Sequence, residues 1–400
     1  MIAPSKSDCT GCAACYAVCS ARCVTMKQDI EGFLYPVIDE ANCTNCAKCE
    51  SVCPTIVQGK VRKPLNVYAA KNLDEEIRYQ SSSGGIFSLL AEYVIKKGGV
   101  VFGARFNDAW EVVHDYTETV EGLVAFRGAK YVQSVTGDTF AQAKEILQKG
   151  RKVLYSGTPC QIAGLKTFLQ KRYDNLFVVD FVCHGVPSPL VWKKYLGEII
   201  GMSPSSAHAT YITNIKFRDK IYGWKNNHFS ILSNDNFFLI AQNSTENSYL
   251  KGFLRDLYLR PSCHNCSFKS FKSGSDITIG DYWGIQNIQP KFDDDKGVSL
   301  VMLNTEKGRN VYSLLCKDDR ETTYVEALIG NPCIEKSVLP HKDRTLFFYS
   351  FYNEPIILLI NKLTAVPLFV RIKQLTVALL SQLGLLIFIR SLLKKEAGYS

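Results

Sequence analysis

The segment CTGCAACYAVC, residues 9–19, places four cysteines within eleven residues and decides how the N-terminal part of the chain folds. Its spacing is Cys9-x2-Cys12-x2-Cys15-x3-Cys19. The same spacing recurs in CTNCAKCESVCP as Cys43-x2-Cys46-x2-Cys49-x3-Cys53, followed by Pro54. This run is typical of bacterial proteins that hold two four-iron clusters, and its repetition makes the signal specific.

The spacing also predicts how the cysteines divide between two clusters. A tight loop places three thiolates on one face of a cuboidal cluster, and the helix that follows carries the fourth to the other cluster. We therefore expect a first N-terminal set of Cys9, Cys12, Cys15 and Cys53, and a second N-terminal set of Cys43, Cys46, Cys49 and Cys19. Structural zinc sites usually pair two Cys-x2-Cys arms across a longer spacer, which does not fit. Ser20 replaces the usual proline, and Cys23 is an additional thiol without an assigned role.

The composition of the 400-residue chain is that of a folded protein, with 46% hydrophobic and 21% charged residues. This excludes disordered and fibrous classes, and the length suggests two or three domains. No basic stretch followed by an apolar run begins the sequence, so we expect no signal peptide and a cytoplasmic location. Free thiols in that compartment indicate metal or redox chemistry.

The net charge of +9 is concentrated outside the first 60 residues. A basic excess of this kind favours an acidic partner protein, an anionic cofactor or a membrane surface. No dense block of Lys and Arg interleaved with aromatic residues is present, so we expect no nucleic-acid binding.

The body of the chain alternates helices and strands after a basic, proline-containing linker at 60–66. A helix is expected after SSSGG, with Ser83 as its N-cap and Gly98–Gly99 as its end. The order that follows is strand 100–106, helix 138–149, strand 152–157, helix 161–171 and strand 176–183. Such an order implies right-handed crossovers and parallel neighbours, with ligands at the carboxyl edge of the strands.

Four cysteines outside the N-terminal runs are candidates for a further site. Cys160 and Cys183 follow two neighbouring parallel strands, and Cys263-x2-Cys266 lies later in the chain. We call Cys160, Cys183, Cys263 and Cys266 the third set. It would suffice for a third four-iron cluster. A zinc site, a redox dithiol or ordinary core cysteines are the alternatives that the spacing leaves open.

The glycines at 84–85 permit a second hypothesis. At a helix N-terminus they allow backbone N–H groups to approach a phosphate, although taken alone an ordinary N-cap after a turn is the favoured explanation. The sequence contains neither a G-x-G-x-x-G after a strand nor a G-x4-G-K-[ST] motif, so it carries no dinucleotide fingerprint and no P-loop.

Six segments together resemble the beta-subunit family of coenzyme F-420 hydrogenase/dehydrogenase: SSSGGIFSLL (81–90), FRGAKYVQS (126–134), SGTPCQIAGL (156–165), DFVCHGVPS (180–188), LRPSCHNCSFK (259–269) and SDITIGDYWGI (275–285). They occur in the family's order across about residues 65–345. The resemblance implies an iron–sulfur flavoprotein that binds FAD without a Rossmann fold.

The resemblance also implies roles for individual residues. The third set becomes the ligand set of a third cluster beside the flavin. The implied FAD contacts are Ser83, Gly84, Gly85, Lys130, Ser134 and Thr158. His184 is implied as a proton donor near the flavin, or as a residue that only orients its neighbouring cysteine.

These observations predict three regions: a ferredoxin-like α+β module at 1–60, an α/β catalytic domain with a partly parallel sheet at 65–345, and a helical tail at 346–400. The expected function is electron transfer between 4Fe-4S clusters, FAD and an external substrate or deazaflavin-type coenzyme. The alternative is an electron-transfer subunit with no substrate of its own. Expected partners are a redox protein such as a ferredoxin, or a small-molecule substrate.

The tail contains an uncharged segment, QLTVALLSQLGLLIFI at 374–389, between Lys373 and Arg390. A spanning helix needs about 20 residues, so this segment is too short. Its basic flanks fit an in-plane membrane anchor at the inner face or a partner helix, and a buried C-terminal helix is the alternative.

Overall fold

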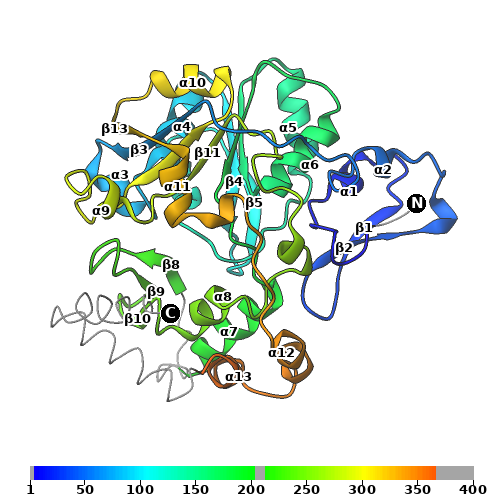
Figure 1. The fold of residues 1–400 in the computed structure, drawn as a ribbon. Coiled ribbons are helices and arrows are strands. Elements are labelled where there is room, and N and C mark those ends of the chain that lie inside the picture. The colour runs from blue at the N-terminus through cyan, green and yellow to red at the C-terminus, as the bar shows by residue number, and fades with distance from the viewer. Residues whose placement is uncertain (1–3, 203–211, 366–400) are drawn as a thin grey trace, which may run out of the picture.

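The computed structural model describes residues 4–202 and 212–365. The apolar segment 374–389 therefore lies outside the described residues. Figure 1 shows a small N-terminal unit beside a larger body that has a sheet-containing lobe and a second, mainly helical lobe. No helix within the described ranges is long and apolar enough to cross a membrane.

The N-terminal unit is built from two short helices and a hairpin. The hairpin pairs β1 (Val24–Gln28) with β2 (Leu34–Ile38) in antiparallel register. Each cysteine run contains a short helix: α1 (Ala14–Val18) lies in the first run, and α2 (Lys48–Ser51) lies in the second. The 3-10 turn Glu40–Asn42 connects the hairpin to the second run.

The large lobe contains an eight-stranded mixed sheet. In spatial order its strands are β13 (Lys317–Thr322), β3 (Asn66–Asn72), β12 (Ser299–Leu303), β11 (Ile277–Asp281), β7 (Leu176–Phe181), β6 (Val153–Gly157), β4 (Val100–Phe106) and β5 (Val112–Thr117). The pairs β11–β7, β7–β6 and β6–β4 are parallel. Strand β12 pairs antiparallel with both β11 and β3, so β3 runs in the same direction as β11. Five strands thus end at one edge of the sheet.

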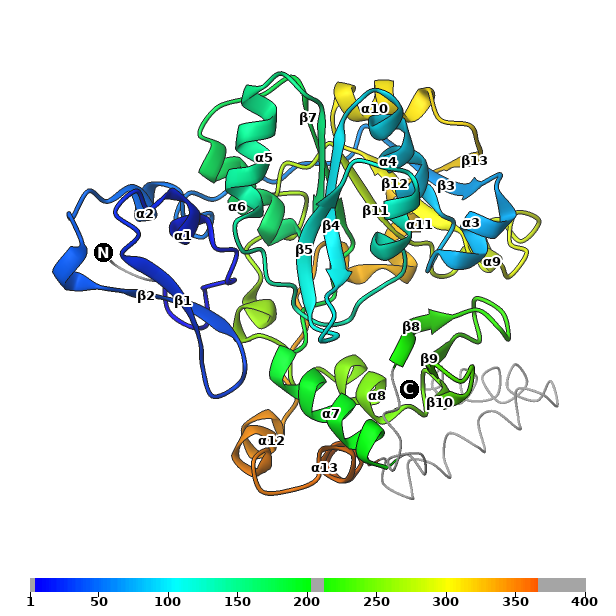
Figure 2. The same cartoon turned by 180° about the vertical axis from the view of Figure 1, so that it is seen from behind.

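Helices cover both faces of this sheet (Figures 1 and 2). Leu154 of β6 packs with α4 (Ile86–Lys96), whereas Tyr155 packs with α5 (Thr139–Gln148) and α6 (Pro159–Leu169) on the opposite face. Adjacent strand residues point to opposite faces, so a sheet buried on both sides needs continuous apolar strands. The remaining helices of this lobe are α3 (Glu75–Gln80), α9 (Ile285–Ile288), α10 (Glu306–Ser313) and α11 (Tyr324–Gly330).

Each helix and strand predicted between residues 86 and 183 is present, with bounds that differ by a few residues at most, but the edge strand β5 and the 3-10 helix Glu121–Phe126 were not predicted. The predicted N-cap is wrong. The cap of α4 is Gly85, with a φ of 82°, and no side chain caps the helix. The Ser83 hydroxyl instead donates to Val298 O at 2.8 Å, because the turn is held against β12.

The second lobe combines a three-stranded antiparallel sheet with four helices around an aromatic core. The sheet order is β10 (Phe238–Asn243), β9 (His228–Ser233), β8 (Ile212–Asp219). The helices are α7 (Pro189–Gly201), α8 (Ser248–Leu254), α12 (Arg344–Ser350) and α13 (Ile356–Leu363). Phe347 and Ile360 are buried in the same core as Trp192. The first part of the predicted tail therefore packs onto the body.

The N-terminal unit is docked on both lobes of the body, on the large lobe by apolar contacts and on the second lobe by an ion pair. Ala14 and Val52 belong to the core formed with Ile162 of α6. Arg344 forms a two-pronged ion pair with Glu31, with N–O distances of 2.9 and 2.5 Å. These contacts hold the cysteine loops beside the start of α6.

Candidate iron–sulfur and electron-transfer site

The two N-terminal cysteine sets line two separate pockets. One pocket is lined by all four cysteines of the first N-terminal set, together with Cys49. The other is lined by all four cysteines of the second N-terminal set, together with Cys23. The structure thus brings together the residues of each expected set, with Cys49 at the wall of both pockets.

The two cysteine loops share one backbone conformation. Gly11 and Ala13 have φ angles of 67° and 65°, and Asn45 and Ala47, at equivalent positions in the second run, have φ angles of 51° and 55°. Left-handed residues alternating with ordinary ones point successive backbone N–H groups inward and form a concavity suited to an anion. Both loops are therefore shaped for an anionic cluster.

Burial keeps several of these thiols protonated in the absence of metal. It raises the pKa of Cys15 to about 12 and that of Cys12 well above its usual value, and neighbouring cysteines add to both shifts. Metal coordination requires the thiolate, so binding of a cluster releases protons at these positions. All fifteen cysteines are free thiols in the structure.

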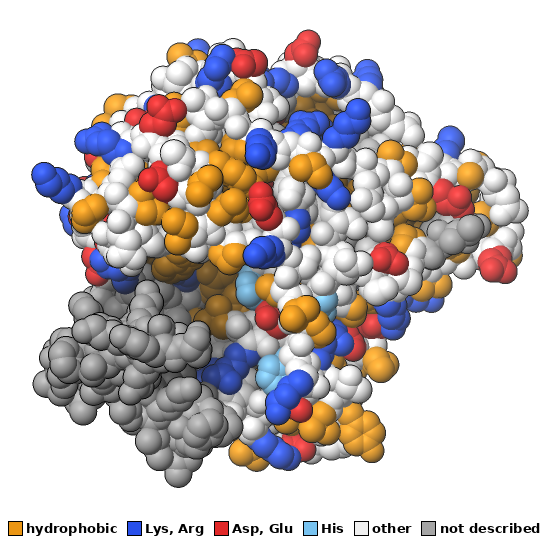
Figure 3. Space-filling view, viewed as in Figure 1, with side chains coloured by type: hydrophobic (Ala, Val, Ile, Leu, Met, Phe, Trp, Pro, Cys, Tyr) orange, Lys and Arg blue, Asp and Glu red, His pale blue; other side chains and the backbone are white. Residues whose placement is uncertain are grey.

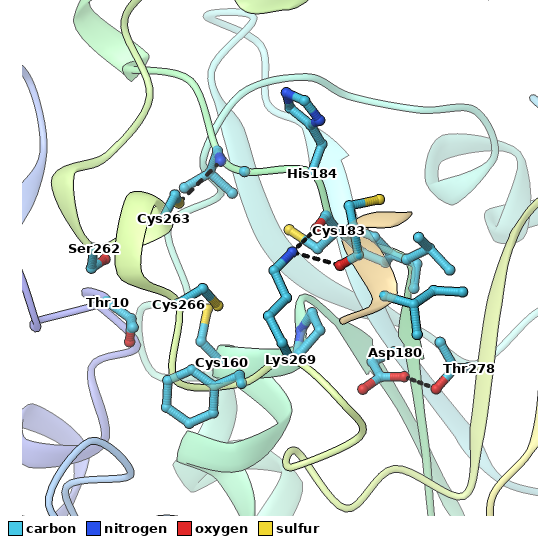
Figure 4. A pocket seen from close by; sticks show the side chains of 18 of the residues that line it. Thr10, Cys160, Asp180, Cys183, His184, Ser262, Cys263, Cys266, Lys269 and Thr278 are labelled. Atoms are coloured by element: carbon cyan, nitrogen blue, oxygen red, sulfur yellow. Dashed lines mark hydrogen bonds between the residues drawn. The ribbon is translucent and has the colours of Figure 1, made fainter. Parts of the chain in front are cut away.

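The third set surrounds one pocket at the carboxyl edge of the sheet (Figure 4). Cys160 is at the start of α6 and Cys183 follows β7. Cys263 lies in the 3-10 turn Pro261–Asn265, and Cys266 comes directly after it. Thr10 of the first N-terminal run is at the wall of this pocket and also of the neighbouring one. The fold therefore places three widely separated segments around a single cavity.

The chemistry of the third set fits a cluster. Burial raises the pKa of Cys160 to about 11 and that of Cys263 to about 12, and the pKa of Cys183 well above its ordinary value. Within the described ranges, no three His, Cys, Asp or Glu side chains are grouped closely enough to hold a single metal ion. A four-iron cluster has four metal corners, so its thiolate ligands stand further apart than those of one ion.

Two cations that the sequence motifs contained, but to which no role was assigned, flank the third set. Lys269 Nζ donates to Cys183 O and Cys333 O, both at 2.7 Å. Arg260 lines the pocket and is 1% exposed. A cation three residues before and another three residues after the Cys263-x2-Cys266 motif was the sequence signal that could have identified them.

His184 lies at the same pocket and is partly open to solvent. Its Nε2 is 2.7 Å from Asp256 Oδ1, and its side chain is 32% exposed. Its ring contacts Phe253 edge-on at a centroid distance of 5.3 Å. Asp256 therefore fixes the orientation of the imidazole. Figure 3 shows hydrophobic and histidine side chains where the surface is hollowed between the two lobes of the body.

The residues implied as FAD contacts fall into two groups at this edge. Ser134 accepts a hydrogen bond from Gln161 Nε2 at 3.0 Å, and Gln161 also bonds Thr158, whose hydroxyl is 3.1 Å from Cys160 Sγ. This group adjoins the third set. The side chain of Gln161 is the link between its members.

The second group is the turn Ser83–Gly85 with Lys130. Ser82 Oγ accepts from Ala129 N at 2.5 Å, which joins the turn to the Lys130 loop. Lys130 Nζ donates to backbone carbonyls of its own loop, the nearest being Arg127 O at 2.9 Å, and burial lowers its pKa to about 7. The N–H of Gly84 is already bonded to Ser299 Oγ at 3.0 Å. The structure thus uses Gly84 for packing.

Arg218 is a further residue at this edge that the sequence did not single out. It forms an ion pair with Asp281 at the end of β11 and stacks on Trp283, with 4.6 Å from its guanidinium carbon to the ring centre. Its Nε and Nη2 are buried and form no hydrogen bond of good geometry among the described residues, although the Tyr131 side chain is close enough to interact with the guanidinium. Buried donors without well-placed acceptors are costly.

Cysteine pockets of this kind, next to the carboxyl edge of an α/β sheet, define an iron–sulfur protein, and residues 8–57 match the 4Fe-4S dicluster domain model. Residues 67–140 and 150–326 match the models for the N-terminal and C-terminal parts of the beta subunit of coenzyme F420 hydrogenase/dehydrogenase. These two matches together span more than half of the chain. The protein belongs to this family of oxidoreductase subunits.

Comparison with individual proteins adds little to this assignment. No curated protein matched the chain. A chain of the xenon-derivatised F420-reducing [NiFe] hydrogenase complex from Methanosarcina barkeri is similar, with 18% identity and a TM-score of 0.46. The similarity covers 68% of this chain and 90% of the other.

Proposed function

We propose that this chain is an iron–sulfur flavoprotein that carries three 4Fe-4S clusters and one FAD, and that it passes electrons between a redox partner and a substrate. The observation that carries the proposal is the convergence of Cys160, Cys183, Cys263 and Cys266 around one pocket. That pocket shares Thr10 with the pocket of the first N-terminal set. Ligands for two clusters are thereby neighbours.

When bound, the clusters supply one-electron transfer and the flavin supplies exchange between one-electron and two-electron chemistry. The role of the polypeptide is to bind and orient these groups and to shield them from solvent. The twelve cysteine thiolates are the proposed ligands: Cys9, Cys12, Cys15, Cys19, Cys43, Cys46, Cys49, Cys53, Cys160, Cys183, Cys263 and Cys266. Lys269 and Arg260 place positive charge beside the third set.

The proposed FAD site is the same carboxyl edge, without a Rossmann fold. Two observations support it. The buried donors of Arg218 lack a well-placed acceptor among the described residues, and a flavin or phosphate oxygen would be one. Lys130 lacks an acidic hydrogen-bond partner among the described residues and adjoins the turn Ser83–Gly85. Ser134 and Thr158 would then lie between the flavin and the third set.

His184 is proposed to donate a proton from Nδ1 on the substrate side of this edge, while its Nε2–H donates to Asp256 Oδ1 and orients the ring. This role requires the imidazole to be reachable, and its 32% exposure meets that requirement. The hydrogen bond to Asp256 fixes the orientation of the imidazole ring that would donate the proton.

A redox partner follows from the family, whose members are named as beta subunits. The runner-up function is therefore an electron-transfer subunit that needs its partner for turnover. A cytoplasmic location remains a proposal, and membrane contact through the tail concerns residues outside the described part of the chain.

Anaerobic purification followed by analysis of iron, sulfide and flavin tests the proposal. About twelve irons and one FAD per chain are expected. Reduction of an artificial acceptor by the isolated chain favours the enzyme, and activity that appears only on adding a partner favours the subunit. A preparation that contains about eight irons and no flavin contradicts the proposal.

A further inference from the structure

Arg260 is a buried cation that lies between the first N-terminal set and the third set. Its Nε donates to Cys9 O at 2.8 Å, and its Nη2 is 3.9 Å from Cys9 Sγ. The same side chain lines the pocket of the third set. Cys9 and Arg260 are 251 positions apart in the sequence. One guanidinium group therefore adjoins two cysteine sets.

The protein supplies no anion for this charge in the part of the chain that the structure describes. The other hydrogen bonds of Arg260 go to Gln133 Oε1 at 3.0 Å and Leu34 O at 2.9 Å, both neutral acceptors. The ring of Tyr35 is 4.3 Å from the guanidinium carbon. A buried charge without a counter-charge costs on the order of several kcal/mol. The simplest physical explanation for a buried arginine at this position is an anion that binds beside it.

The two cysteine sets are the place where such anions would be. A cuboidal iron–sulfur core with four thiolate ligands carries net negative charge, and nearby charge and hydrogen bonds set its potential. The guanidinium is hydrogen-bonded to Cys9 O and lies 3.9 Å from Cys9 Sγ of the first N-terminal set, and it lines the pocket of the third set.

We propose that Arg260 is the shared counter-charge of the clusters bound by the first N-terminal set and the third set, and that it holds them as consecutive redox centres on the electron-transfer path. This inference rests on the proposed function. Arg260 is a positioning residue: its fork ties Cys9 O and Leu34 O to the turn that carries Cys263.

The physical consequence is a higher reduction potential at both clusters. Reduction adds negative charge, and a fixed cation beside the cluster favours that state. Arg260 contacts Cys9 of the first N-terminal set, but it neither lines the pocket of the second N-terminal set nor forms a hydrogen bond with a cysteine of that set. The cluster of that set should therefore be insensitive to Arg260, and it serves as an internal reference.

The test compares the full chain, purified without oxygen, with the variants Arg260→Gln, Arg260→Lys and Arg344→Gln. Arg344 is the matched control because it also ties the N-terminal unit to the body, through Glu31 and Leu259 O. Iron is counted first, and potentials are then measured by redox titration followed by electron paramagnetic resonance.

Arg260→Gln should lower the ratio of reduced to oxidised centre about tenfold at a fixed potential, which is 59 mV for a one-electron couple. The change should affect the first and third centres and spare the second. Arg260→Lys and Arg344→Gln should shift none of them by more than about threefold. Loss of iron from both centres in Arg260→Gln, with full iron in Arg260→Lys, also supports the proposal.

Full iron and unchanged potentials in Arg260→Gln would overturn the inference and leave the proposed function intact. Equal iron loss in Arg260→Gln and Arg260→Lys would overturn it as well, because shape and not charge would then be required. If the unaltered chain itself lacks the third cluster, the failure belongs to the proposed function.

Discussion

Replacing Gly84 with alanine separates a packing role from a ligand-binding role at the turn before α4. A Cβ atom at Gly84 would be 2.3 Å from Ala70 O and 2.6 Å from Ser299 N, both of them backbone atoms. Neither atom can move without shifting a strand of the sheet. The N–H of Gly84 also donates to Ser299 Oγ, and its carbonyl accepts from Asn72 N at 2.7 Å.

The expected cost follows from these contacts. Overpacking a well-packed site costs about 1–3 kcal/mol, and each weakened buried hydrogen bond adds about 1 kcal/mol. With two such hydrogen bonds, Gly84→Ala should therefore lower the free energy of unfolding by about 3–5 kcal/mol. Gly197 is the control: it lies in α7, a Cβ there meets nothing within 4 Å, and Gly197→Ala should stabilise by about 0.5–1 kcal/mol.

Anaerobic urea unfolding followed by circular dichroism measures both differences, and flavin content is determined on the same samples. The packing argument is refuted if Gly84→Ala is as stable as the parent chain. Unchanged stability with loss of flavin would assign the glycine to the cofactor.

Three further predictions concern charged and thiol groups near the cysteine sets. Lys269→Met removes the ammonium that donates to Cys183 O, so it should lower the potential of the third centre alone in a redox titration; an equal shift at all centres would contradict this. Burial raises the pKa of Asp180 from 3.8 to about 6, so its ionisation costs stability above that pH and nothing below about pH 4. Asp180→Asn should accordingly gain up to about 3 kcal/mol relative to the parent as the pH rises from about 4 to about 6, and parallel pH profiles in urea unfolding would refute the argument. Cys23→Ala should keep the full iron content although its sulfur is 3.4 Å from Cys19 Sγ, whereas loss of about four irons would make Cys23 a ligand.

Local pattern was sufficient where the residues that decide a structure are close in sequence. The alternation of apolar helices and strands from Ile86 to Phe181 gave the parallel part of the sheet, because each element buries a continuous apolar face. The repeated cysteine spacing likewise predicted two loops of the same form, and the equivalent left-handed residues in both runs agree with it.

Tertiary contacts decided the features that local pattern missed. Ser83 was expected to cap α4, but Val298 O, 215 positions away, takes its hydroxyl. The pairing of Arg218 with Asp281 joins the second lobe to the sheet edge. The hydrophobic periodicity of a sequence does not predict such contacts, because each contact depends on how distant helices and strands are placed in the fold.

The most direct test of the account is the iron content of Cys160→Ser beside that of Cys316→Ser, both purified without oxygen. Cys160 lies in the pocket of the third set, whereas Cys316 is exposed and lies outside all the cysteine pockets described above. The account predicts about eight irons per chain in the first variant and about twelve in the second. Equal iron in the two variants would contradict a cluster bound by the third set.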